Sequence, residues 1–379
     1  MSVVITAQDI DPLIEGLTIL GTGGGGSPEF GRRILENDLR RGRTLVLTPP
    51  EAIADDAQVV SGGIMGSTKI IDQLGFDAIV ERWESSFELA EASRVMERVL
   101  GRRIDYIVPF EVGALNTPVI LSLAARLGIG AVDGDALGRS APETQMTSFI
   151  GHGISLTPMP LVDSDGNVIV VEKAVRPTFP DELGRRMLGL GSHMGANNHY
   201  PMCGRDLKRA VIPGTVSGAL ELGRKVLAAR AHGQDPVRAI AEHLHGRLVF
   251  SGTVVSLQEV ETEGFYSTTV RLTAVPTSPT REAELTIQNE TMILRLEGQL
   301  AAVFPDLVCM VDPASGRGIL STELREGLSV ALIATACHPR LRAAATSDAG
   351  RESFAPATFG FPDLTYRPVE DLLSTLGLW

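Results

Sequence analysis

Between residues 43 and 132 the chain alternates short apolar runs with amphipathic segments, and this alternation constrains the fold more than any other feature. The last connecting segment, 116–127, is rich in Ala and Leu and ends at Gly128, which predicts a helix. The predicted strands are RTLVL (43–47), AQVVSGG (57–63), DYIVPF (105–110) and IGAV (129–132). Strands that alternate with helices are typical of an α/β domain with a mostly parallel sheet.

The character of the chain changes after a predicted hairpin turn at 163–167. Two predicted helices, at 180–190 and 214–232, are followed from Gly246 onward by runs in which Thr, Val and Leu alternate between Gly and Pro turns. This pattern predicts a β-rich barrel or sandwich. We therefore predict two domains, an α/β domain over 1–167 and a second domain over 168–379.

Charge and composition narrow the class of partner. The 34 Lys and Arg residues face 46 Asp and Glu residues, for a net charge of -12. Nucleic acids and anionic membranes attract cationic surfaces, so neither partner is expected. The sequence shows no apolar run of about 18 residues and no signal-peptide pattern at its start. With three cysteines in 379 residues, a disulfide framework is not expected, and we predict a cytoplasmic protein.

The segment GTGGGGSP, residues 21–28, stands between two predicted helices. Consecutive glycines let backbone N–H groups point into one concavity, and the following helix adds its positive end, so a phosphate, carboxylate or oxyanion fits there. The segment is not a Walker A motif, because no lysine follows at the required spacing. The alternative is a flexible turn. The predicted substrate-binding residues of this loop are Thr22, Gly23, Gly24, Gly25 and Gly26.

A second glycine segment, GGIMG at 62–66, ends a predicted strand. It forms either another wall of the same site, through Gly63 and Met65, or a place where a helix packs closely on the sheet.

Polar residues also follow the next two predicted strands. Crowded carboxyl groups raise one another's pKa, as a general base near neutral pH requires, so Glu111 and Asp135 are candidate bases. Arg139 is a candidate clamp for a substrate carboxylate. The alternative is structural: Asp133 and Asp135 cap a helix, and Arg139 pairs with Glu143. The further candidate substrate-binding residues are Asn116, Asp133, Glu143 and Gln145.

The segment HMGANNHYPMCG, residues 193–204, combines two histidines, two asparagines and a cysteine. These groups can coordinate a divalent metal such as Zn²⁺ or polarise a carbonyl, which makes Asn198 and His199 candidate catalytic residues. None of the standard zinc spacings is present, so the metal ligands stay unassigned. The alternatives are a loop of solvated histidines, including His193, and a Cys203 that fills space in the core.

Motifs along nearly the whole chain resemble one family. They are GTGGGGSPEFGR, GGIMG, FEVGALN, VDGDALGRSAPETQM, PMCGRDLKRAVIPGT, LTIQNE and FPDLVCMVD. In this order they are similar to the S-methyl thiohydantoin desulfurase family. The resemblance implies an N-terminal α/β domain, a β-rich swivelling-type C-terminal domain and a bacterial setting near hydantoinase or oxoprolinase genes. It also implies hydrolytic desulfurisation of a thiohydantoin to sulfide and a hydantoin. Cys203 departs from the Thr or Ser expected after PM.

For that reaction, a base must deprotonate water that attacks C2 of the ring. We predict Glu111 or Asp135 as this base, the amides of Gly24, Gly25 and Asn198 as stabilisers of the developing charge, and Arg139 as a substrate clamp. The alternatives are a ring-opening hydrolase of a hydantoin or cyclic amide, a non-catalytic ligand-binding subunit of a hydantoinase assembly, and a nucleotide-dependent enzyme. Apolar strands near 285–310 suggest a homo-oligomer, although core packing explains them equally.

Overall fold

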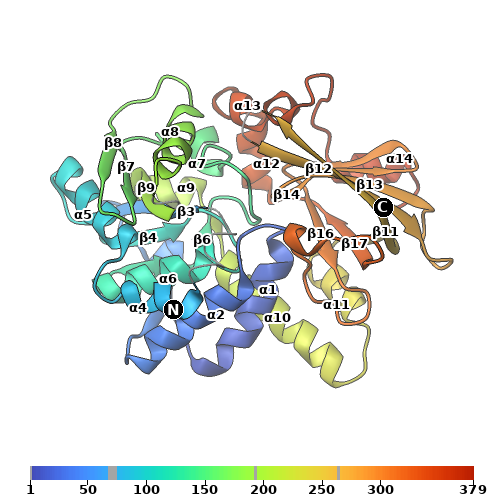
Figure 1. The fold of residues 1–379 in the computed structure, drawn as a ribbon, viewed down its shortest axis with the longest axis horizontal. Helices are drawn as coiled ribbons and strands as arrows, with labels where there is room; N and C mark the ends of the chain where they lie inside the picture. The colour runs from blue at the N-terminus through green and yellow to red at the C-terminus, as the bar shows by residue number, and fades with distance from the viewer. Residues whose placement is uncertain (1, 67–74, 192–193, 263–264) are drawn as a thin grey trace.

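Two β-sheets organise the chain, one in each half (Figure 1). The computed structural model describes residues 2–66, 75–191, 194–262 and 265–379. Within these residues the first sheet has eight strands. In spatial order they are β1 (Val3–Ile5), β2 (Leu45–Thr48), β5 (Gly130–Val132), β4 (Tyr106–Pro109), β3 (Gln58–Gly66), β9 (Met194–Cys203), β7 (Met159–Asp163) and β8 (Val168–Val171).

The centre of this sheet is the predicted α/β unit. Strands β2, β5, β4 and β3 are parallel neighbours. Antiparallel strands flank them, β1 on one side and β9, β7 and β8 on the other. Because parallel strands end at the same edge, the residues that follow β4 and β5 meet there, beside Gly62 of β3, which lies opposite Pro109. The fold is therefore α/β with a mixed sheet whose parallel strands are central.

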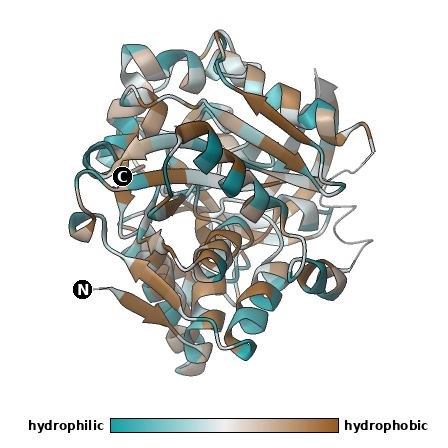
Figure 2. Cartoon of the chain, turned by 90° about the vertical axis from the view of Figure 1, so that its left-hand side faces the viewer, coloured by the Kyte–Doolittle hydropathy of each residue, from teal (hydrophilic) through white to brown (hydrophobic). Residues whose placement is uncertain are grey.

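Helices cover both faces of the first sheet. Helix α2 begins because Ser27 accepts a hydrogen bond from the Phe30 amide and Pro28 occupies the first turn. One face packs against α2 (Pro28–Arg40), α5 (Glu88–Leu100) and α6 (Asn116–Leu127), and α4 (Phe76–Arg82) packs on α2. The other face packs against α7 (Ser148–Gly151), α8 (Phe179–Leu188) and α9 (Gly204–Ala210). Hydrophobic and hydrophilic residues alternate along the helices nearest the viewer in Figure 2.

Two helices distant in sequence pack closely through glycines. In α1 (Ile10–Leu20), a side chain at Gly16 would collide with the Ala219 carbonyl of α10 (Thr215–Ala231). In α10, a side chain at Gly223 would collide with the Pro12 carbonyl. These two contacts fix α1, and with it the start of the glycine loop, against a helix that belongs to the second half of the sequence.

The second sheet is an antiparallel half-barrel that has seven strands among the described residues. In spatial order they are β15 (Gln299–Val303), β14 (Glu290–Leu296), β13 (Glu282–Gln288), β12 (Phe265–Ala274), β11 (Arg247–Thr262), β17 (Ser329–Thr335) and β16 (Leu307–Val311). The remaining helices are α11 (Pro236–His243), α12 (Pro339–Thr346), α13 (Asp348–Phe354) and α14 (Val369–Thr375). The apolar residues of β14 and β16 are buried within this chain. The core of a single chain therefore explains the apolar strands near 285–310 from which a homo-oligomer was predicted. The homo-oligomer stays a prediction.

The segment predicted as a histidine-bearing loop is a strand instead. Strand β9 pairs with β3 on one side and β7 on the other. Its Asn and His content is typical of loops, but it is paired on both sides, and Gly195 lets it approach Val162 of β7 closely. The first sheet therefore includes β8 and β9, which lie beyond residue 167.

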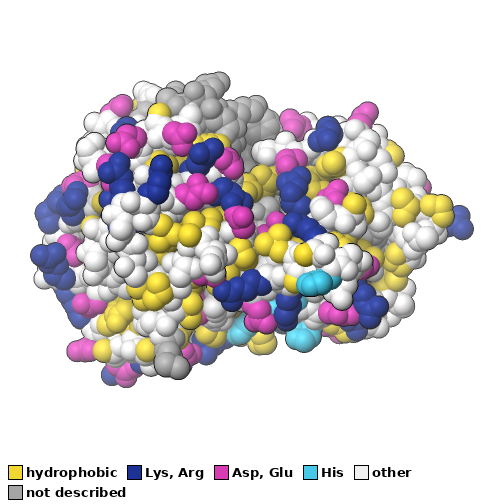
Figure 3. Space-filling view, turned by 90° about the horizontal axis from the view of Figure 1, so that it is seen from below, with side chains coloured by type: hydrophobic (Ala, Val, Ile, Leu, Met, Phe, Trp, Pro, Cys, Tyr) yellow, Lys and Arg dark blue, Asp and Glu magenta, His cyan; other side chains and the backbone are white. Residues whose placement is uncertain are grey.

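The face seen in Figure 3 carries interspersed acidic and basic side chains, with hydrophobic patches between them. No helix among the described residues is long and apolar enough to cross a membrane.

Candidate active site

The glycine loop and Glu111 lie together at the carboxyl edge of the parallel strands. Glu111 follows β4. The Leu115 amide, a few residues further, donates to the Gly25 carbonyl at 2.8 Å. A Cβ at Gly25 would lie 2.6 Å from the Gly113 Cα atom, so only glycine allows this approach. The predicted convergence of the loop with the residues after β4 is present in the fold.

The four consecutive glycines have two different physical causes. Gly23, Gly25 and Gly26 adopt positive φ angles of 102°, 79° and 82°, which favour glycine. Gly24 does not, but a side chain there would collide with the carboxyl group of Glu290. The loop is therefore shaped around a carboxyl group from β14 in the other half of the chain.

The anion expected in the glycine loop is thus part of the protein. The Gly25 amide favours the ionised form of the Glu290 carboxyl group, and the Gly24 amide donates to the Gly21 carbonyl at 2.9 Å. These two amides are engaged within the chain, so we no longer assign them to substrate charge. Glu290 is not among the predicted site residues, although it lies in the motif LTIQNE that carries the family resemblance.

Glu111 and Glu290 form a buried acidic pair. Each side chain is only 3 % exposed. Burial, with a smaller contribution from the charge of Asp135, raises the pKa of Glu111 to about 7. Burial also raises the pKa of Glu290 well above its usual value, and the charge of Glu111 adds to this shift. The charge of Glu111 therefore disfavours ionisation of Glu290.

The two members of the pair differ in their partners. Glu111 accepts hydrogen bonds from Asn116 Nδ2 at 2.6 Å and from the Ala141 amide at 2.7 Å, and both favour its ionised form. Within the described chain, Oε2 of Glu290 is buried without a hydrogen-bond partner. Asn116 and Gly24, which contact the two acids, are half-buried and form the solvent side of the pair.

Arg139 is a fully buried link between the two halves of the chain. Its Nη1 donates to the Asp306 carbonyl at 2.7 Å, and Nη2 donates to the Thr291 carbonyl at 2.8 Å and to Thr22 Oγ1 at 3.1 Å. Its guanidinium also lies 4.7 Å from the centre of the Phe304 ring. We therefore replace its predicted role as a substrate clamp with a positioning role that holds Thr22 of the loop. Its charge also lowers the pKa of Glu290.

The predicted acids after β5 are structural. Asp135, in the short strand β6 (Gly134–Asp135), accepts hydrogen bonds from the amides of Val112, Leu137 and Gly138. Burial raises its pKa to about 7, but its oxygens close this turn, and we no longer assign it as a base. Asp133 accepts from the amide and hydroxyl of Ser217 in the first turn of α10. The capping alternative therefore describes Asp133 better than substrate binding does.

Glu143 and Gln145 pair with each other rather than with Arg139. Gln145 Nε2 donates to Glu143 Oε2 at 2.5 Å, while Gln145 Oε1 is buried without a hydrogen-bond partner in the described residues. Burial, followed by the charge of Asp181 on α8, raises the pKa of Glu143 to about 7. This loop is therefore a second place with a proton near neutral pH.

Strand β9 carries two kinds of polar side chain. Asn198 is fully engaged, accepting from Ser93 Oγ at 2.8 Å and donating to the Ser61 carbonyl at 3.0 Å, so its predicted role in stabilising substrate charge is replaced by a structural one. His199 and Asn197 are buried, and His199 Nδ1 and Asn197 Oδ1 have no hydrogen-bond partners among the described residues. Burial lowers the pKa of His199 to about 3, so this imidazole is neutral. Asn197 was not among the predicted site residues.

The described residues contain no group of three or more His, Cys, Asp or Glu side chains that could hold a metal. His193 lies outside the described residues. Burial raises the pKa of Cys309 to about 12 and that of Cys337 above its usual range, so these two thiols are protonated. Cys203 is half-buried and donates to Asp206 Oδ2 at 3.3 Å.

Comparisons with known proteins assign the family. A model described as "S-Me-THD-like, N-terminal domain" matches residues 8–173, and one described as "S-Me-THD-like, C-terminal domain" matches residues 177–369. The chain belongs to the S-Me-THD-like family. This family name ties the chain to thiohydantoin chemistry, as the motifs implied.

The fold of this S-Me-THD-like protein is shared with a solved structure. The crystal structure of a protein from Chromobacterium violaceum superposes with a TM-score of 0.76 at 23% sequence identity, covering 97% of this chain and 100% of that chain. No curated protein matches the sequence. The structural likeness supports the two-sheet architecture alone.

Proposed function

We propose that this protein is a hydrolase that replaces the sulfur of a thiohydantoin-type ring with oxygen, releasing sulfide and a hydantoin. Family membership suggests the class of ring. The buried pair of Glu111 and Glu290 is the observation that carries the type of reaction. Two neighbouring carboxyl groups with raised pKa values supply one base and one acid near neutral pH.

The partners of each carboxyl group suggest its role. Glu111 is the base, because Asn116 and the Ala141 amide stabilise its ionised form. Glu290 is the acid, because burial and the charge of Glu111 both raise its pKa and its Oε2 atom has no partner within the described residues. Asn116 and Gly24, at the half-buried side of the pair, mark the direction from which the ring approaches.

The reaction begins as Glu111 takes a proton from water while the water oxygen bonds to C2 of the ring. The electron pair of the C2=S bond moves to sulfur, which takes the proton of Glu290. Ionised Glu290 then takes the proton of the new C2 hydroxyl group, the C2=O bond forms and the C2–S bond breaks. The leaving sulfur takes the proton held by Glu111. One water is consumed, one hydrogen sulfide is released, and both carboxyl groups return to their first state.

The test is sulfide release from a 5-substituted thiohydantoin by the purified protein, with the organic product identified by mass spectrometry. We expect sulfide and the hydantoin from the wild type, and a large loss of activity in Glu111→Gln and Glu290→Gln. Glu88→Gln is the matched control, since Glu88 is a buried glutamate that instead pairs with Arg82.

Three outcomes would contradict the proposal. An N-carbamoyl acid without sulfide would indicate a ring-opening hydrolase. Binding of the ring without turnover would indicate a ligand-binding subunit, which a hydantoinase partner would have to complete. Undiminished sulfide release by both glutamine variants would remove the acidic pair from the mechanism.

A further inference from the structure

Three buried polar atoms near the acidic pair have no hydrogen-bond partner within the described chain. They are Asn197 Oδ1, His199 Nδ1 and Gln145 Oε1. Their side chains are 2 %, 1 % and 0 % exposed. A buried polar atom without a hydrogen-bond partner destabilises the folded protein, so three of them in one region indicate a place that a ligand fills.

Two of the three side chains are presented to one face of the first sheet. Asn197 and His199 are two residues apart on β9, so they point to the same side. Asn197 lies opposite Leu161 of β7, and Leu161 packs toward Gly184 of α8. The face is therefore the one covered by α8.

The loop that carries Gln145 is fastened over this face. Tyr200 Oη of β9 donates to the Thr144 carbonyl at 2.9 Å, and Thr144 Oγ1 donates to Asp181 of α8 at 3.3 Å. Arg185 Nη2, also on α8, donates to the Pro142 carbonyl at 3.0 Å. These bonds hold Gln145 between β9 and α8.

Gly63 provides a flat surface beside these atoms. It lies opposite Asn197 in the β3–β9 pairing, and no described atom lies within 4 Å of where its Cβ would be. The preceding glycine differs, since a Cβ at Gly62 would lie 2.4 Å from Asn198 Nδ2. Gly62 is thus required by packing, whereas the absence of a side chain at Gly63 leaves space.

We propose that Asn197, His199 and Gln145 form a recognition subsite for a planar, uncharged five-membered ring that lies over Gly63 and donates its N–H groups to them. The proposal rests on the proposed function for the identity of the ring. It adds the residues that select a cyclic amide or thioamide with free N–H groups.

The chemistry of the subsite fits such a ring. Amide oxygens are hydrogen-bond acceptors, and the neutral imidazole of His199 offers a lone pair on one nitrogen. The Phe110 ring packs edge-on to His199 at 5.7 Å, and half-buried Met65 lies two residues after Gly63, so apolar surface borders the polar atoms.

The subsite adjoins the acidic pair through two short connections. Phe110, which contacts His199, is followed directly by Glu111. Ala141, whose amide binds Glu111, begins the loop that leads to Gln145. A ring held at the subsite therefore lies next to the proposed base.

The first test uses calorimetric binding of hydantoin and its N1-methyl and N3-methyl derivatives to the full-length protein. We expect hydantoin to bind the wild type, and at least one methyl derivative to bind at least tenfold more weakly. Gly63→Leu should remove binding by filling the space. Gly218→Leu is the matched control, because no described atom lies within 4 Å of the Cβ position at Gly218 on α10 either. Equal binding of all three rings, no binding of hydantoin, or unchanged binding to Gly63→Leu would overturn the subsite.

The second test separates the subsite from the proposed function. Asn197→Ala and Gln145→Ala should raise KM for the thiohydantoin at least tenfold with a smaller change in kcat, and should reduce the discrimination against the methyl derivatives. Unchanged KM in both variants would contradict the subsite and leave sulfide release standing. Hydantoin binding that Gly63→Leu removes, in a wild type that releases no sulfide, would support the subsite and contradict the proposed function. Should either alanine variant fail to fold, the wild-type ring comparison and Gly63→Leu still decide.

Discussion

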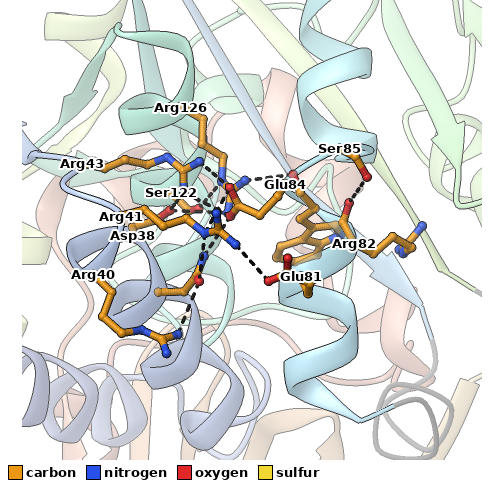
Figure 4. A network of polar contacts seen from close by, with 12 residues as sticks. Asp38, Arg40, Arg41, Arg43, Glu81, Arg82, Glu84, Ser85, Ser122 and Arg126 are labelled. Carbon is orange, nitrogen blue, oxygen red and sulfur yellow. Dashed lines mark hydrogen bonds and ion pairs between the residues drawn. The ribbon is translucent and has the colours of Figure 1, made fainter.

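Two clusters of acidic side chains in this protein differ in how the nearest arginines bind them. In the cluster of Figure 4, Arg43 binds Asp38 at 2.8 Å and Glu84 at 2.6 Å, and Arg126 binds Glu84 at 2.8 Å. The bond from Arg43 is the main reason that the pKa of Glu84 falls to about 2. At the glycine loop, Glu111 and Glu290 share the neighbourhood of Arg139, whose donors bind carbonyl and hydroxyl oxygens.

The difference separates a structural cluster from a reactive one. Where arginines bind the half-buried Glu84 directly, its carboxylate stays ionised, and the network holds α2, α6 and the segment after α4 together. At the fully buried Asp38 of the same network, burial outweighs the two arginines and raises the pKa. Where the cation is engaged elsewhere, burial keeps protons on the acids near neutral pH. A proton available at neutral pH is what acid–base catalysis requires.

The largest expected effect is on catalysis by the reactive cluster. Glu111→Gln and Glu290→Gln should each lower kcat for sulfide release by roughly 10²–10⁴-fold, the usual contribution of one acid or base. Glu84→Gln should leave kcat within about threefold of the wild type, since Glu84 belongs to the structural cluster. Steady-state sulfide assays of the folded variants measure this. A loss in Glu84→Gln equal to that in Glu290→Gln would erase the distinction.

Removal of the buried Arg139 cation at the loop should have the next largest effect, a loss of folding stability. Arg139→Met leaves Glu290 without its nearby positive charge and the Asp306 and Thr291 carbonyls without donors. Breaking a buried charged network costs about 3–5 kcal/mol, which urea unfolding would record. Arg103→Met, at an exposed arginine, is the control and should change stability little. Equal stability of the two variants would contradict the linking role of Arg139.

Glu111 of one cluster and Glu84 of the other should also respond to pH with opposite signs. The folded pKa of Glu111, about 7, lies above the usual value of 4.5, so the folded state binds more protons and stability falls as pH rises from about 4.5 to 7. The folded pKa of Glu84, about 2, lies below 4.5, so its contribution is complete above pH 4.5 and is lost as pH falls toward 2.

Each unit of difference is worth about 1.4 kcal/mol. Urea midpoints at pH 5 and pH 7.5 should therefore show that Glu111→Gln gains stability relative to the wild type at the higher pH. A parallel shift at both pH values would show that Glu111 does not titrate in this range.

The smallest effect concerns the exposed end of the structural cluster. Arg41 is 40% exposed and pairs with Glu81, which is 73% exposed. Because solvent screens such pairs, Arg41→Ala should cost less than about 1 kcal/mol in thermal unfolding. A much larger loss would mean that the network acts as one unit out to its surface.

The sequence predicted which strand end and which loop form the site, because both depend on local sequence patterns. Alternating strands and helices fixed the position of Glu111 after β4, and the run of glycines indicated an anion. The identity of the anion could not be derived, because Glu290 comes from a strand in the other half of the chain. The only signal for Glu290 was its place in the motif LTIQNE.

The site residues that the structure reassigns share one cause. The type of a residue does not show which hydrogen-bond partners it has in the folded protein. Asp135, Arg139 and Asn198 carry the right groups for catalysis, but backbone and side-chain partners engage them. Asn197 was passed over beside Asn198, although alternation along a strand turns the two to opposite faces. Recognition of β9 as a strand would have separated them.

The pH profile of kcat/KM for sulfide release tests the central claim most directly. The account predicts a bell shape in the wild type, with the rising limb from ionisation of Glu111 and the falling limb from loss of the proton of Glu290. In Glu290→Gln the residual activity should keep the rising limb and lose the falling one. An identical bell in the variant would contradict an acid and a base supplied by the two halves of the chain.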